Sequence, residues 1–596
     1  MTPTTARLET RTSGPLTEVL AEVLGHETGI SSAGFPFLAA PAYDALRDRI
    51  PQLMGWGAQT WDALEELCSS LDGLDEGQRH HVLQSRRVVQ QVLRTAAITA
   101  PPALWSLRHV LGALAEVGIT RRLLAEEAIV PSDTVLQADE LDTDLSFLSV
   151  LGLVDRSGGA FRLSDRPEAR RVLESLGPLP DNEPVHAAAL WAKACGGDPL
   201  EESEHAHLLV LGGGAMPRSN HFQTNWFPTY EEIALGYRLV PLIVGMASAG
   251  TTVDCLKQTS IAPIDIVPDH PDLGSAALQL LHAAGVARPV PGLSECVLTP
   301  LGRRLLERGP GPFGIIEAYQ PYMAQLSEIL KHGRGSVHLT RSTNIAASQR
   351  ANRESFRKAN DSLDHFCRDT GFRYSVFIEH ALGRGEATRQ RFVRSGGKSI
   401  QFVGADLEDA AINAAQAERD VGTLPEDMIF VRNADIGRAD ILLDALAEHG
   451  VDSQGSVMMV GNGFHEIRDA DDEKLITVFQ AYADAGIVLI FTEETALSIG
   501  DQRATAWNTY HPSFRYVHEK SGQGLRPATN RVTSADDPLP MSWTTCAEAG
   551  GYTRMEAYCG PGRTIYPCPP PGGHNPSTYM NYFFVPASVA AGLPRR

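Results

Sequence analysis

The chain has 596 residues, of which 43% are hydrophobic and 21% charged, and at roughly 100–200 residues per domain this length predicts two to four domains, each able to bury a core. Asp and Glu number 72 and Lys and Arg 52, which gives a formal net charge of -20. Because a general nucleic-acid binder needs positive charge to attract phosphates, this balance argues against a nucleic-acid partner.

Neither the first residues nor any later stretch predicts membrane insertion. The opening MTPTTARLETRTSG contains no apolar run of the signal-peptide type, and the most apolar later stretch, 233–250, is short for a membrane span and contains Arg238 and Pro241. The eight cysteines form no CxxC pair, so neither a disulfide framework nor a zinc ribbon is indicated. We therefore expect a cytoplasmic protein with no membrane partner.

Helical periodicity dominates the first half of the chain. It runs through residues 15–130, where the pair Pro101 and Pro102 predicts a break. Residues 141–177 then follow the order helix, Gly-containing turn, short strand GAFRLS and second helix, which is the order of a winged-helix unit. The same order returns at 274–308, with ECVLT as the strand. Two related helical and winged-helix units are therefore predicted.

Residues 178–230, between these units, are rich in Pro, Gly, His and Asn and predict a long connection or lid. The candidate recognition helices contain Glu, Asp and Ala as often as Arg, so DNA binding is the less favoured use of the winged helices. We expect a helical domain with a winged-helix unit, a connection or lid, a second winged-helix unit that covers the active site, and a sheet domain with a C-terminal lid loop. The corresponding boundaries are 1–180, 181–230, 231–365 and 366–596.

From residue 374 onward, apolar runs of strand length alternate with helices, which is the pattern of a doubly wound parallel sheet. The five runs are 374–380, 399–406, 427–435, 456–464 and 486–494. The predicted fold class is therefore α/β, with a C-terminal Rossmann-like doubly wound parallel sheet preceded by α-helical and winged-helix units. In such a sheet, ligands bind beyond the carboxyl ends of the strands.

Acidic residues stand at the ends of the first three runs. Glu379 precedes a Gly-x-Gly turn; a carboxylate can hold an ammonium group or a ribose hydroxyl, and glycine lets the backbone pass close to a ligand. Asp406 follows about twenty residues beyond the turn, where it can accept both hydroxyls of an adenosine ribose. Asp435 ends the third run. This layout predicts an S-adenosylmethionine site, for which the candidate residues are Glu379, Gly383, Gly385, Asp406, Leu407, Asp435, Ile436 and Gly461.

A nicotinamide dinucleotide is the natural alternative ligand, because its fold also places an acidic residue on a ribose. Its GxGxxG turn presents helix N–H groups to a pyrophosphate. Here the run ALGRGEATRQ lacks the third glycine and has Glu386 at the start of the helix, where negative charge would repel phosphate. The sulfonium cofactor is therefore favoured over NAD.

The fourth run ends in GNGFHEIRD, which places His465 and Glu466 beside the expected position of the methyl donor. Imidazole can take a proton from a substrate near neutral pH, or bind a metal that acidifies a carbon acid or a hydroxyl. We therefore take His465 and Glu466 as the catalytic candidates. A histidine that merely packs in or caps the loop is an equally good interpretation of this pattern.

The order of helical and winged-helix units, the segment 335–356 and the sheet resembles the class I S-adenosylmethionine-dependent methyltransferase superfamily. Within it, the chain is most similar to the starter-unit C-methyltransferase domains of the apratoxin and saxitoxin synthases. The motifs that carry this likeness are AYQPYMAQLSEILKHG (318–333), the HLTR segment with His338, Arg341 and Asn344, NADIGRADILLDALAEHGV (433–451), and TYMNYFFVP (578–586).

This resemblance implies C-methylation of an activated, malonyl-type acid in natural-product biosynthesis, on a small-molecule or carrier-bound acyl substrate, and a possible homodimer. It also implies one metal ion, for which iron, manganese and cobalt are the candidates. His465 would be one ligand and Gln523, in SGQGLRP, a second; a solvated loop amide is the alternative reading of Gln523. The chain departs from the family's glycine loop at Ala381, which replaces the first glycine.

Two further hypotheses stay open. The run HEIRDADDEK is similar to the base motif of small-molecule O-methyltransferases, with Ile467 in place of an aromatic residue, and His465 would then be a general base in metal-free O- or N-methylation. The altered glycine loop also fits a non-catalytic scaffold or regulator that binds S-adenosylmethionine.

The C-terminal stretch 536–580 contains three cysteines and a histidine, whose spacing does not match a zinc site. These residues are Cys546, Cys559, Cys568 and His574. The Pro-rich sequence of the stretch 536–580 predicts a loop that covers the active site. His511 and His518, which precede it, could approach the site.

Overall fold

The structure is a computed structural model that describes most of the chain. The described residues are 18–20, 22, 28–30, 36–38, 73, 75–179, 186–213, 229–336, 345–396, 399–497, 499, 502, 511–528, 539–564 and 577–593. The chain divides into two compact units. Unit 1 comprises Met1–His338, Ile499–Val517 and Ile565–Pro576, and unit 2 comprises Leu339–Ser498, His518–Thr564 and Ser577–Arg596.

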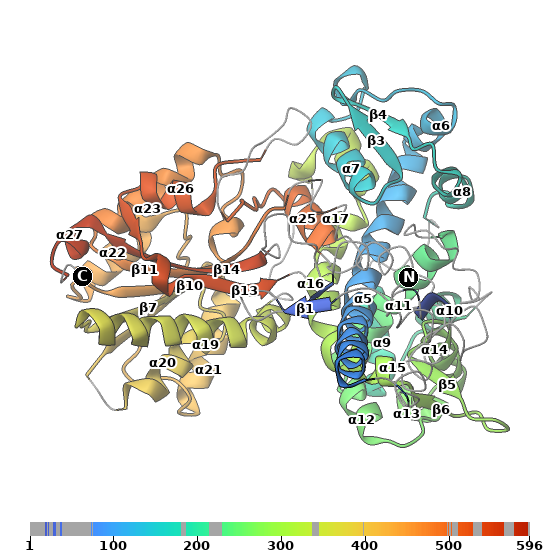
Figure 1. Ribbon diagram of the computed structural model, residues 1–596, viewed down its shortest axis with the longest axis horizontal. Helices are drawn as coiled ribbons and strands as arrows, with labels where there is room; N and C mark the ends of the chain where they lie inside the picture. The colour runs from blue at the N-terminus through green and yellow to red at the C-terminus, as the bar shows by residue number, and fades with distance from the viewer. Residues whose placement is uncertain are drawn as a thin grey trace. The chain divides into compact units, whose positions relative to one another are not determined.

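Unit 1 is mostly helical and includes three short β hairpins (Figure 1). Its strands are β1 (Thr28–Ile30), β2 (Pro36–Leu38), β3 (Val154–Ser157), β4 (Ala160–Leu163), β5 (Ala287–Pro289) and β6 (Cys296–Leu298). Its α-helices before the hairpin β5–β6 are α5 (Glu76–Glu116), α6 (Ile119–Leu124), α7 (Ala138–Val150), α8 (Pro167–Ser175), α9 (Ala187–Gly196), α10 (Glu202–Gly212), α11 (Tyr230–Ser248), α12 (Thr251–Lys257), α13 (Pro263–Ile266) and α14 (Pro271–Ala283). The remaining ones are α15 (Pro300–Arg308), α16 (Pro310–Glu317), α17 (Gln320–Met323) and α18 (Leu326–His332), with 3-10 turns η1 (Pro131–Asp133) and η3 (Arg334–Ser336).

Glycines on α11 allow its neighbours to approach closely. A Cβ atom at Gly236 would lie 2.6 Å from the Cβ of Leu104 on α5, and one at Gly245 would lie 2.4 Å from the Cβ of Trp191 on α9. Both distances are shorter than any real carbon contact. The two glycines therefore allow α11 to pack closely against both α5 and α9. Leu104 and Trp191 are buried at these two contacts.

Within residues 15–130, α5 and α6 confirm the helical prediction, whereas the hairpin β1–β2 contradicts it at 28–38 and the predicted break at Pro101 and Pro102 is wrong. Helix α5 continues through both prolines to Glu116. A proline inside a helix removes one backbone hydrogen bond. Residues 101–107 are buried among other elements of unit 1, so tertiary packing outweighs the local preference.

Both predicted winged-helix segments contain a helix, an antiparallel hairpin and a second helix. The first is α7, β3–β4 and α8, and the second is α14, β5–β6 and α15. Their assignment as winged helices stays a prediction. The expected connection 181–230 is more structured than its composition suggested, because α9 and α10 both lie within it.

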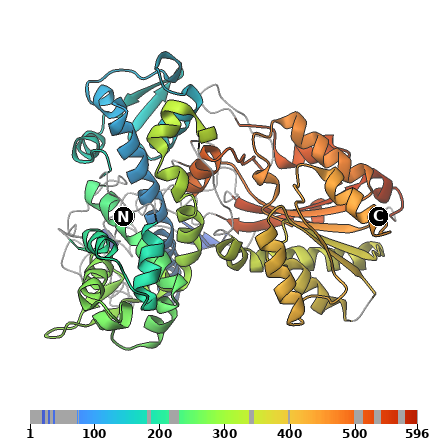
Figure 2. The same cartoon turned by 180° about the vertical axis from the view of Figure 1, so that it is seen from behind.

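Unit 2 is a sheet with helices on both faces, as the sequence predicted (Figures 1 and 2). Its strands are β7 (Val376–His380), β8 (Gln401–Ala405), β9 (Ile429–Val431), β10 (Val457–Gly461), β11 (Val488–Glu494), β12 (Tyr552–Arg554), β13 (Gly560–Thr564) and β14 (Ser577–Pro586). Its helices are α19 (Ile345–Thr370), α20 (Glu386–Ser395), α21 (Asp409–Asp420), α22 (Ala439–Glu448), α23 (Asp472–Asp484), α25 (His511–Lys520, shared with unit 1), α26 (Trp543–Ala549) and α27 (Ala587–Ala590), with 3-10 turns η5 (Phe464–Glu466) and η6 (Glu556–Tyr558).

The strand order is β12-β14-β11-β10-β7-β8-β9, and β13 also pairs with β14. Strands β7 to β11 are the five predicted runs, and they pair in parallel. The chain order reverses between β7 and β10, so their carboxyl ends mark the switch point where doubly wound sheets bind ligands. Strand β14 is antiparallel to β11 and β12. The predicted α/β fold with a Rossmann-like, mostly parallel sheet is therefore confirmed.

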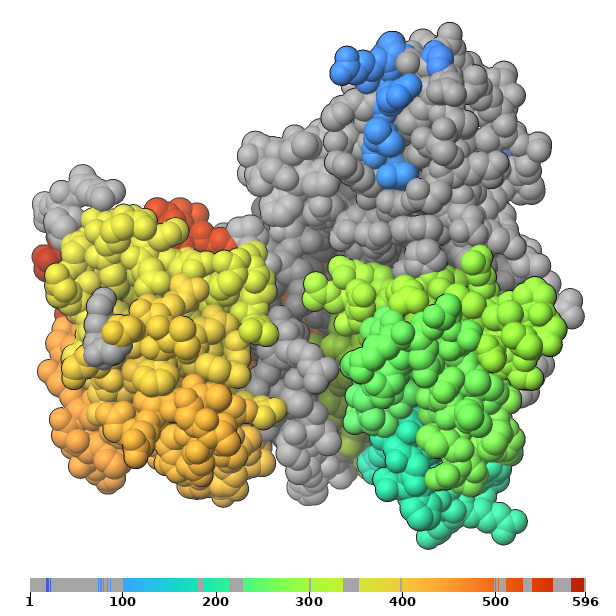
Figure 3. Space-filling model, turned by 90° about the horizontal axis from the view of Figure 1, so that it is seen from below, coloured from blue at the N-terminus to red at the C-terminus, as the bar shows by residue number. Residues whose placement is uncertain are grey.

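Alternating side chains of the buried strands point to opposite faces of the sheet and belong to two hydrophobic cores. Val376 and Ile378 of β7 face the helices α22, α23 and α26, while Phe377 between them faces α19, α20 and α21. Strands that are covered on both faces are near-continuous apolar runs, which is why the sequence pattern predicted them. The ribbon in Figure 1 shows α19, α20 and α21 on one face of the sheet, and in Figure 3 this part of unit 2 forms a yellow to orange surface.

The predicted C-terminal lid loop is partly regular structure. Between residues 539 and 564 the chain forms α26, β12 and β13, and both strands pair with β14 at the sheet edge. Residues 565–576 lie outside the described part of the chain, so the lid prediction is left untested there.

Within the described residues, no single helix is long and apolar enough to cross a membrane. Helices α11 and α12 meet the length and composition criteria only as a pair, and they are bent by 86° at their junction.

Candidate active site

Asp406 makes hydrogen bonds that link the loops after β7, β8 and β9 in unit 2. Its Oδ2 accepts a hydrogen bond from the N–H of Gly383, 2.9 Å away in the loop after β7, and its Oδ1 accepts one from Glu408, also at 2.9 Å. The carbonyl of Asp406 accepts the N–H of Ala434 in the loop after β9. Burial raises the pKa of Asp406, although these backbone hydrogen bonds favour its charged form.

The loop between β7 and α20 makes a tight left-handed path. Gly383 and Gly385 have φ of 54° and 78°, and Ala381, which replaces the usual first glycine, has φ of 56°. A side chain in this region is strained. A Cβ atom on Gly385 would also lie 2.9 Å from Leu424. The glycines are therefore required by the fold of the turn itself.

The carboxylate of Glu379 is engaged by the helix that follows this turn. Its Oε1 and Oε2 accept the N–H groups of Ala387 and Thr388 at 3.2 and 2.6 Å, so it caps the first turn of α20. Burial raises the pKa of Glu379 to about 7 against the effect of these hydrogen bonds. Its expected contact with a cofactor ammonium group stays a prediction, because both oxygens already serve the backbone.

The remaining cofactor candidates occupy different environments. Leu407 is 42% exposed although it is a large apolar side chain, which leaves apolar surface directly beside Asp406. Asp435 is partly exposed and its Oδ1 accepts the N–H of Gly437. Ile436 is buried in the core. A Cβ atom on Gly461 would lie 2.3 Å from the ring of Phe356, so this glycine makes room for α19.

The loops after β7, β9 and β10 meet at one place. A Cβ atom on Gly463, after β10, would lie 3.2 Å from both the Cβ of Ala381 and the Cδ1 of Ile436. The charge of Glu466 also acts on Asp406. The structure therefore brings the predicted catalytic loop beside the predicted cofactor loops, at the carboxyl ends of the strands.

His465 is paired with a carboxylate that the sequence interpretation missed. Its Nδ1 lies 2.5 Å from Oε2 of Glu493, at the end of β11, and both side chains are almost fully buried. The other oxygen of Glu493 accepts the backbone N–H of Phe464 at 2.6 Å. Burial alone would lower the pKa of His465, but the charge and hydrogen bond of Glu493 outweigh it and raise this pKa above its ordinary value.

The second ring nitrogen of His465 faces a polar group of residues. Its Nε2 lies 3.7 Å from Oε1 of Glu466, and the amide of Gln523 donates to the other oxygen of Glu466. The ring of His518 meets that of His465 edge to face, with centroids 4.9 Å apart. The structure thus places Gln523 and His518, both only candidates from sequence, beside His465.

Glu493 carried a signal that could have identified it. It stands in FTEE at the carboxyl end of the fifth apolar run, where ligand-binding residues are expected. The adjacent Glu494 made the choice between the two ambiguous, because neighbouring residues of a strand point to opposite faces.

Several other candidates receive no test. His338, Arg341, Asn344, Cys568 and His574 lie outside the described residues. Cys546 is buried, and its Sγ lies near the guanidinium of Arg526. Among the described residues, neither Cys546 nor Cys559 belongs to a group suited to a metal ion.

No protein-family model and no curated protein matches the chain. The chain is similar to several solved structures of methyltransferases. One is PigF with SAH (13% identity, TM-score 0.37, covering 59% of this chain and 97% of that one). Others are an O-methyltransferase family protein from Burkholderia thailandensis (17%, 0.35, 59% and 95%) and the CMeT domain of the citrinin polyketide synthase (11%, 0.32, 84% and 93%). These scores and identities are too low to transfer a function to the chain.

Proposed function

We propose that the chain is an S-adenosylmethionine-dependent methyltransferase that acts on a small biosynthetic intermediate, with His465 as the base that activates the acceptor. The observation that carries this proposal is the buried pair of His465, in the loop after β10, and Glu493, at the carboxyl end of β11. It lies next to the loop of Asp406, whose carboxylate is suited to a ribose. The proposed base and the proposed cofactor-binding loop are therefore adjacent.

The residues around Asp406 fit the adenosine part of this cofactor. Each carboxylate oxygen accepts one backbone N–H, and each has a further lone pair with which to accept a ribose hydroxyl. Leu407 supplies exposed apolar surface beside it, and the glycine turn lets the backbone come near a ligand. When bound, S-adenosylmethionine supplies an electrophilic methyl group.

His465 is arranged to hold a proton. The carboxylate of Glu493 accepts Nδ1–H and so fixes the tautomer in which Nε2 is the free base. The same carboxylate stabilises the imidazolium that forms when Nε2 takes a proton, which raises the pKa. Such a base can remove a proton from a hydroxyl, an amine or an activated carbon acid.

A metal-assisted reaction is the second candidate, because Gln523 lies against Glu466. His465 Nε2 with oxygens of Glu466 and Gln523 is a donor set that suits iron, manganese or cobalt. The hydrogen bond from Nδ1 to Glu493 is the usual support behind a metal-bound histidine. A bound metal would supply Lewis acidity to an enolate, in line with C-methylation of an activated acid, free or carrier-bound.

Calorimetric titration of S-adenosylmethionine into the full chain tests the proposal. We expect micromolar binding that is lost in Asp406→Ala, because the ribose loses its acceptor. The matched control is Asp409→Ala, three residues along, which removes only a surface ion pair with Arg432; it should bind like the wild type. If the wild type binds no S-adenosylmethionine with or without added metal, the proposal is wrong.

Turnover assays then separate the forms of the reaction. Activity on hydroxyl or amine acceptors that survives EDTA supports the base mechanism. Activity on a malonyl-type acceptor that is lost with EDTA and restored by iron, manganese or cobalt supports the metal. Tight cofactor binding without turnover on any acceptor would instead indicate the scaffold or regulator.

A further inference from the structure

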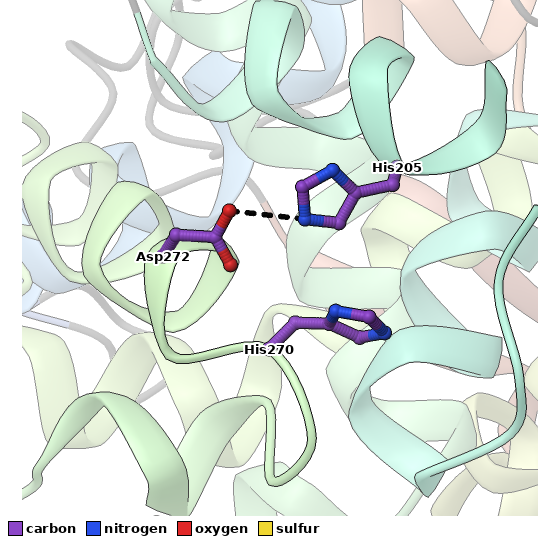
Figure 4. Close-up of side chains that lie close together, drawn as sticks. All are labelled: His205, His270 and Asp272. Atoms are coloured by element: carbon purple, nitrogen blue, oxygen red, sulfur yellow. Dashed lines mark ion pairs between the residues drawn. The ribbon is translucent and has the colours of Figure 1, made fainter. Parts of the chain in front are cut away.

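Two histidines and an aspartate converge in unit 1, on elements that play no part in the proposed reaction. They are His205 on α10, His270 just before α14, and Asp272 in the first turn of α14 (Figure 4). Nε2 of His205 lies 3.0 Å from Oδ2 of Asp272, and the two imidazole rings have centroids 5.0 Å apart. One ligand atom from each residue lies within 4.8 Å of the other two.

The fold holds these three side chains in place from two directions. Helices α10 and α14 pack against each other, and Ala276 of α14 would touch a Cβ atom on Gly212 at 3.0 Å. Pro271 fixes the backbone between His270 and Asp272 at the start of α14. The cluster therefore joins α10 to the first turn of α14 and to His270, the residue directly before that helix.

The distances suit a tetrahedral cation. Bonds of about 2.0–2.1 Å to nitrogen and oxygen place neighbouring ligand atoms about 3.3 Å apart. The distance of 3.0 Å between Nε2 of His205 and Oδ2 of Asp272 is close to that value, and the three ligand atoms all lie within 4.8 Å of one another. The side chain of His205 is 27% exposed and that of Asp272 52%, so water can reach the fourth position.

The local charge also favours a cation. The carboxylate of Asp272 supplies a negative charge close to both imidazole rings. Asp272 also offsets the partial positive charge at the start of α14. A single ion pair uses one histidine only, whereas a metal ion would use both.

We propose that His205, His270 and Asp272 bind one Zn²⁺ ion that clamps α10 to the start of α14, with water as its fourth ligand. Two imidazoles and a carboxylate form a donor set that zinc prefers. His205, His270 and Asp272 all belong to unit 1, whereas His465 belongs to unit 2. The zinc proposal therefore does not depend on the proposed methyl transfer.

The test measures zinc by titration of the metal-free full chain in wild type, His205→Ala, His270→Ala and Asp272→Asn. The control His207→Ala changes a histidine on the same helix, two residues along and thus on a different face. We expect each of the three variants to bind one zinc equivalent fewer than the wild type, and His207→Ala to bind as many. Any zinc held at His465 is common to all proteins and cancels.

Zinc should also raise the melting temperature of the wild type more than that of His205→Ala, because a ligand that binds only the folded state stabilises it. If a variant does not fold, chemical modification of the wild type decides: zinc should protect His205 and His270 from diethyl pyrocarbonate, and leave His207 reactive. Equal zinc content in all variants, or no protection of His205 and His270, would overturn the proposal.

Discussion

His465 gains its chemical character from Glu493. The carboxylate both orients the imidazole through Nδ1 and raises its pKa. A base is active in its neutral form, so activity should increase with pH as His465 loses its proton, and that increase should occur above the pH of an ordinary histidine, about 6.5. Glu493 also binds the N–H of Phe464, so the same residue holds the loop that carries the histidine.

Glu493→Gln tests this role at the scale of one residue. The variant removes the charge that raises the pKa of His465 and leaves burial, which lowers it, so the acidic limb of the kcat/KM profile should move to lower pH. The maximal rate should fall about 10- to 100-fold, as for other residues that support a functional histidine. The measurement is a pH–rate profile of both proteins.

The control for this prediction is Glu494→Gln. Glu494 is equally buried but makes a smaller contribution to the pKa of His465, so its profile should shift less. An unchanged acidic limb in Glu493→Gln would show that His465 does not act as the base.

At the scale of elements, the contact between β10 and α19 depends on a glycine, Gly461, which has no side chain. Gly461→Ala would place a Cβ atom 2.3 Å from the buried ring of Phe356. Overpacking of this kind costs about 1–3 kcal/mol of the free energy of unfolding. We expect Gly461→Ala to lower stability by that amount in chemical denaturation.

Two further variants make this prediction specific. Phe356→Leu should make room for the new methyl group, so the double variant should lose less stability than the sum of the two single changes. Gly524→Ala is the control, because a Cβ atom there has no neighbour within 4 Å. Strict additivity of the two changes would contradict the contact.

The sequence patterns were most informative for the five parallel strands. The side chains of β7, β10 and β11 are buried on both faces, so these strands are near-continuous apolar runs, whereas the edge strand β9 is only partly buried and spans three residues of the predicted run 427–435. Strands β12 and β13 escaped prediction because they are short, and GPGRT in β13 has the composition of a turn. The helix through Pro101 shows the opposite case, in which burial overrides a clear local signal.

At the scale of the whole molecule, the last strand, β14, joins the parallel strands of unit 2 to the two short strands β12 and β13. Strand β14 lies between β11 on one side and β12 with β13 on the other, and Tyr582, Phe583 and Phe584 on it are fully buried. Without β14, β11 would keep β10 as its neighbour but become an exposed edge strand. Both cores would also lose side chains, because Tyr582 and Phe584 lie in one and Phe583 in the other.

Removal of residues 577–596 should therefore abolish the cooperative unfolding transition of unit 2 and make residues 345–564 sensitive to limited proteolysis. Removal of residues 587–596 alone is the control, because no side chain of α27 is fully buried and only the partly buried Val589, Ala590 and Leu593 pack against the core. It should keep the transition and cost little stability. A shortened chain without β14 that still unfolds cooperatively in unit 2 would contradict this prediction.

The sequence by itself determined the α/β class, the five parallel strands, and the positions of Asp406 and His465 at strand ends. These follow from periodicity and from the order of strands along the chain, which are local properties. Only the tertiary structure decided that Glu493 pairs with His465, that Glu379 caps α20, and that His205 meets His270 and Asp272. The pairs His465–Glu493 and His205–Asp272 join side chains far apart in sequence, and Glu379 bonds to backbone N–H groups eight and nine residues along. All three contacts depend on how the elements pack, which no local pattern encodes.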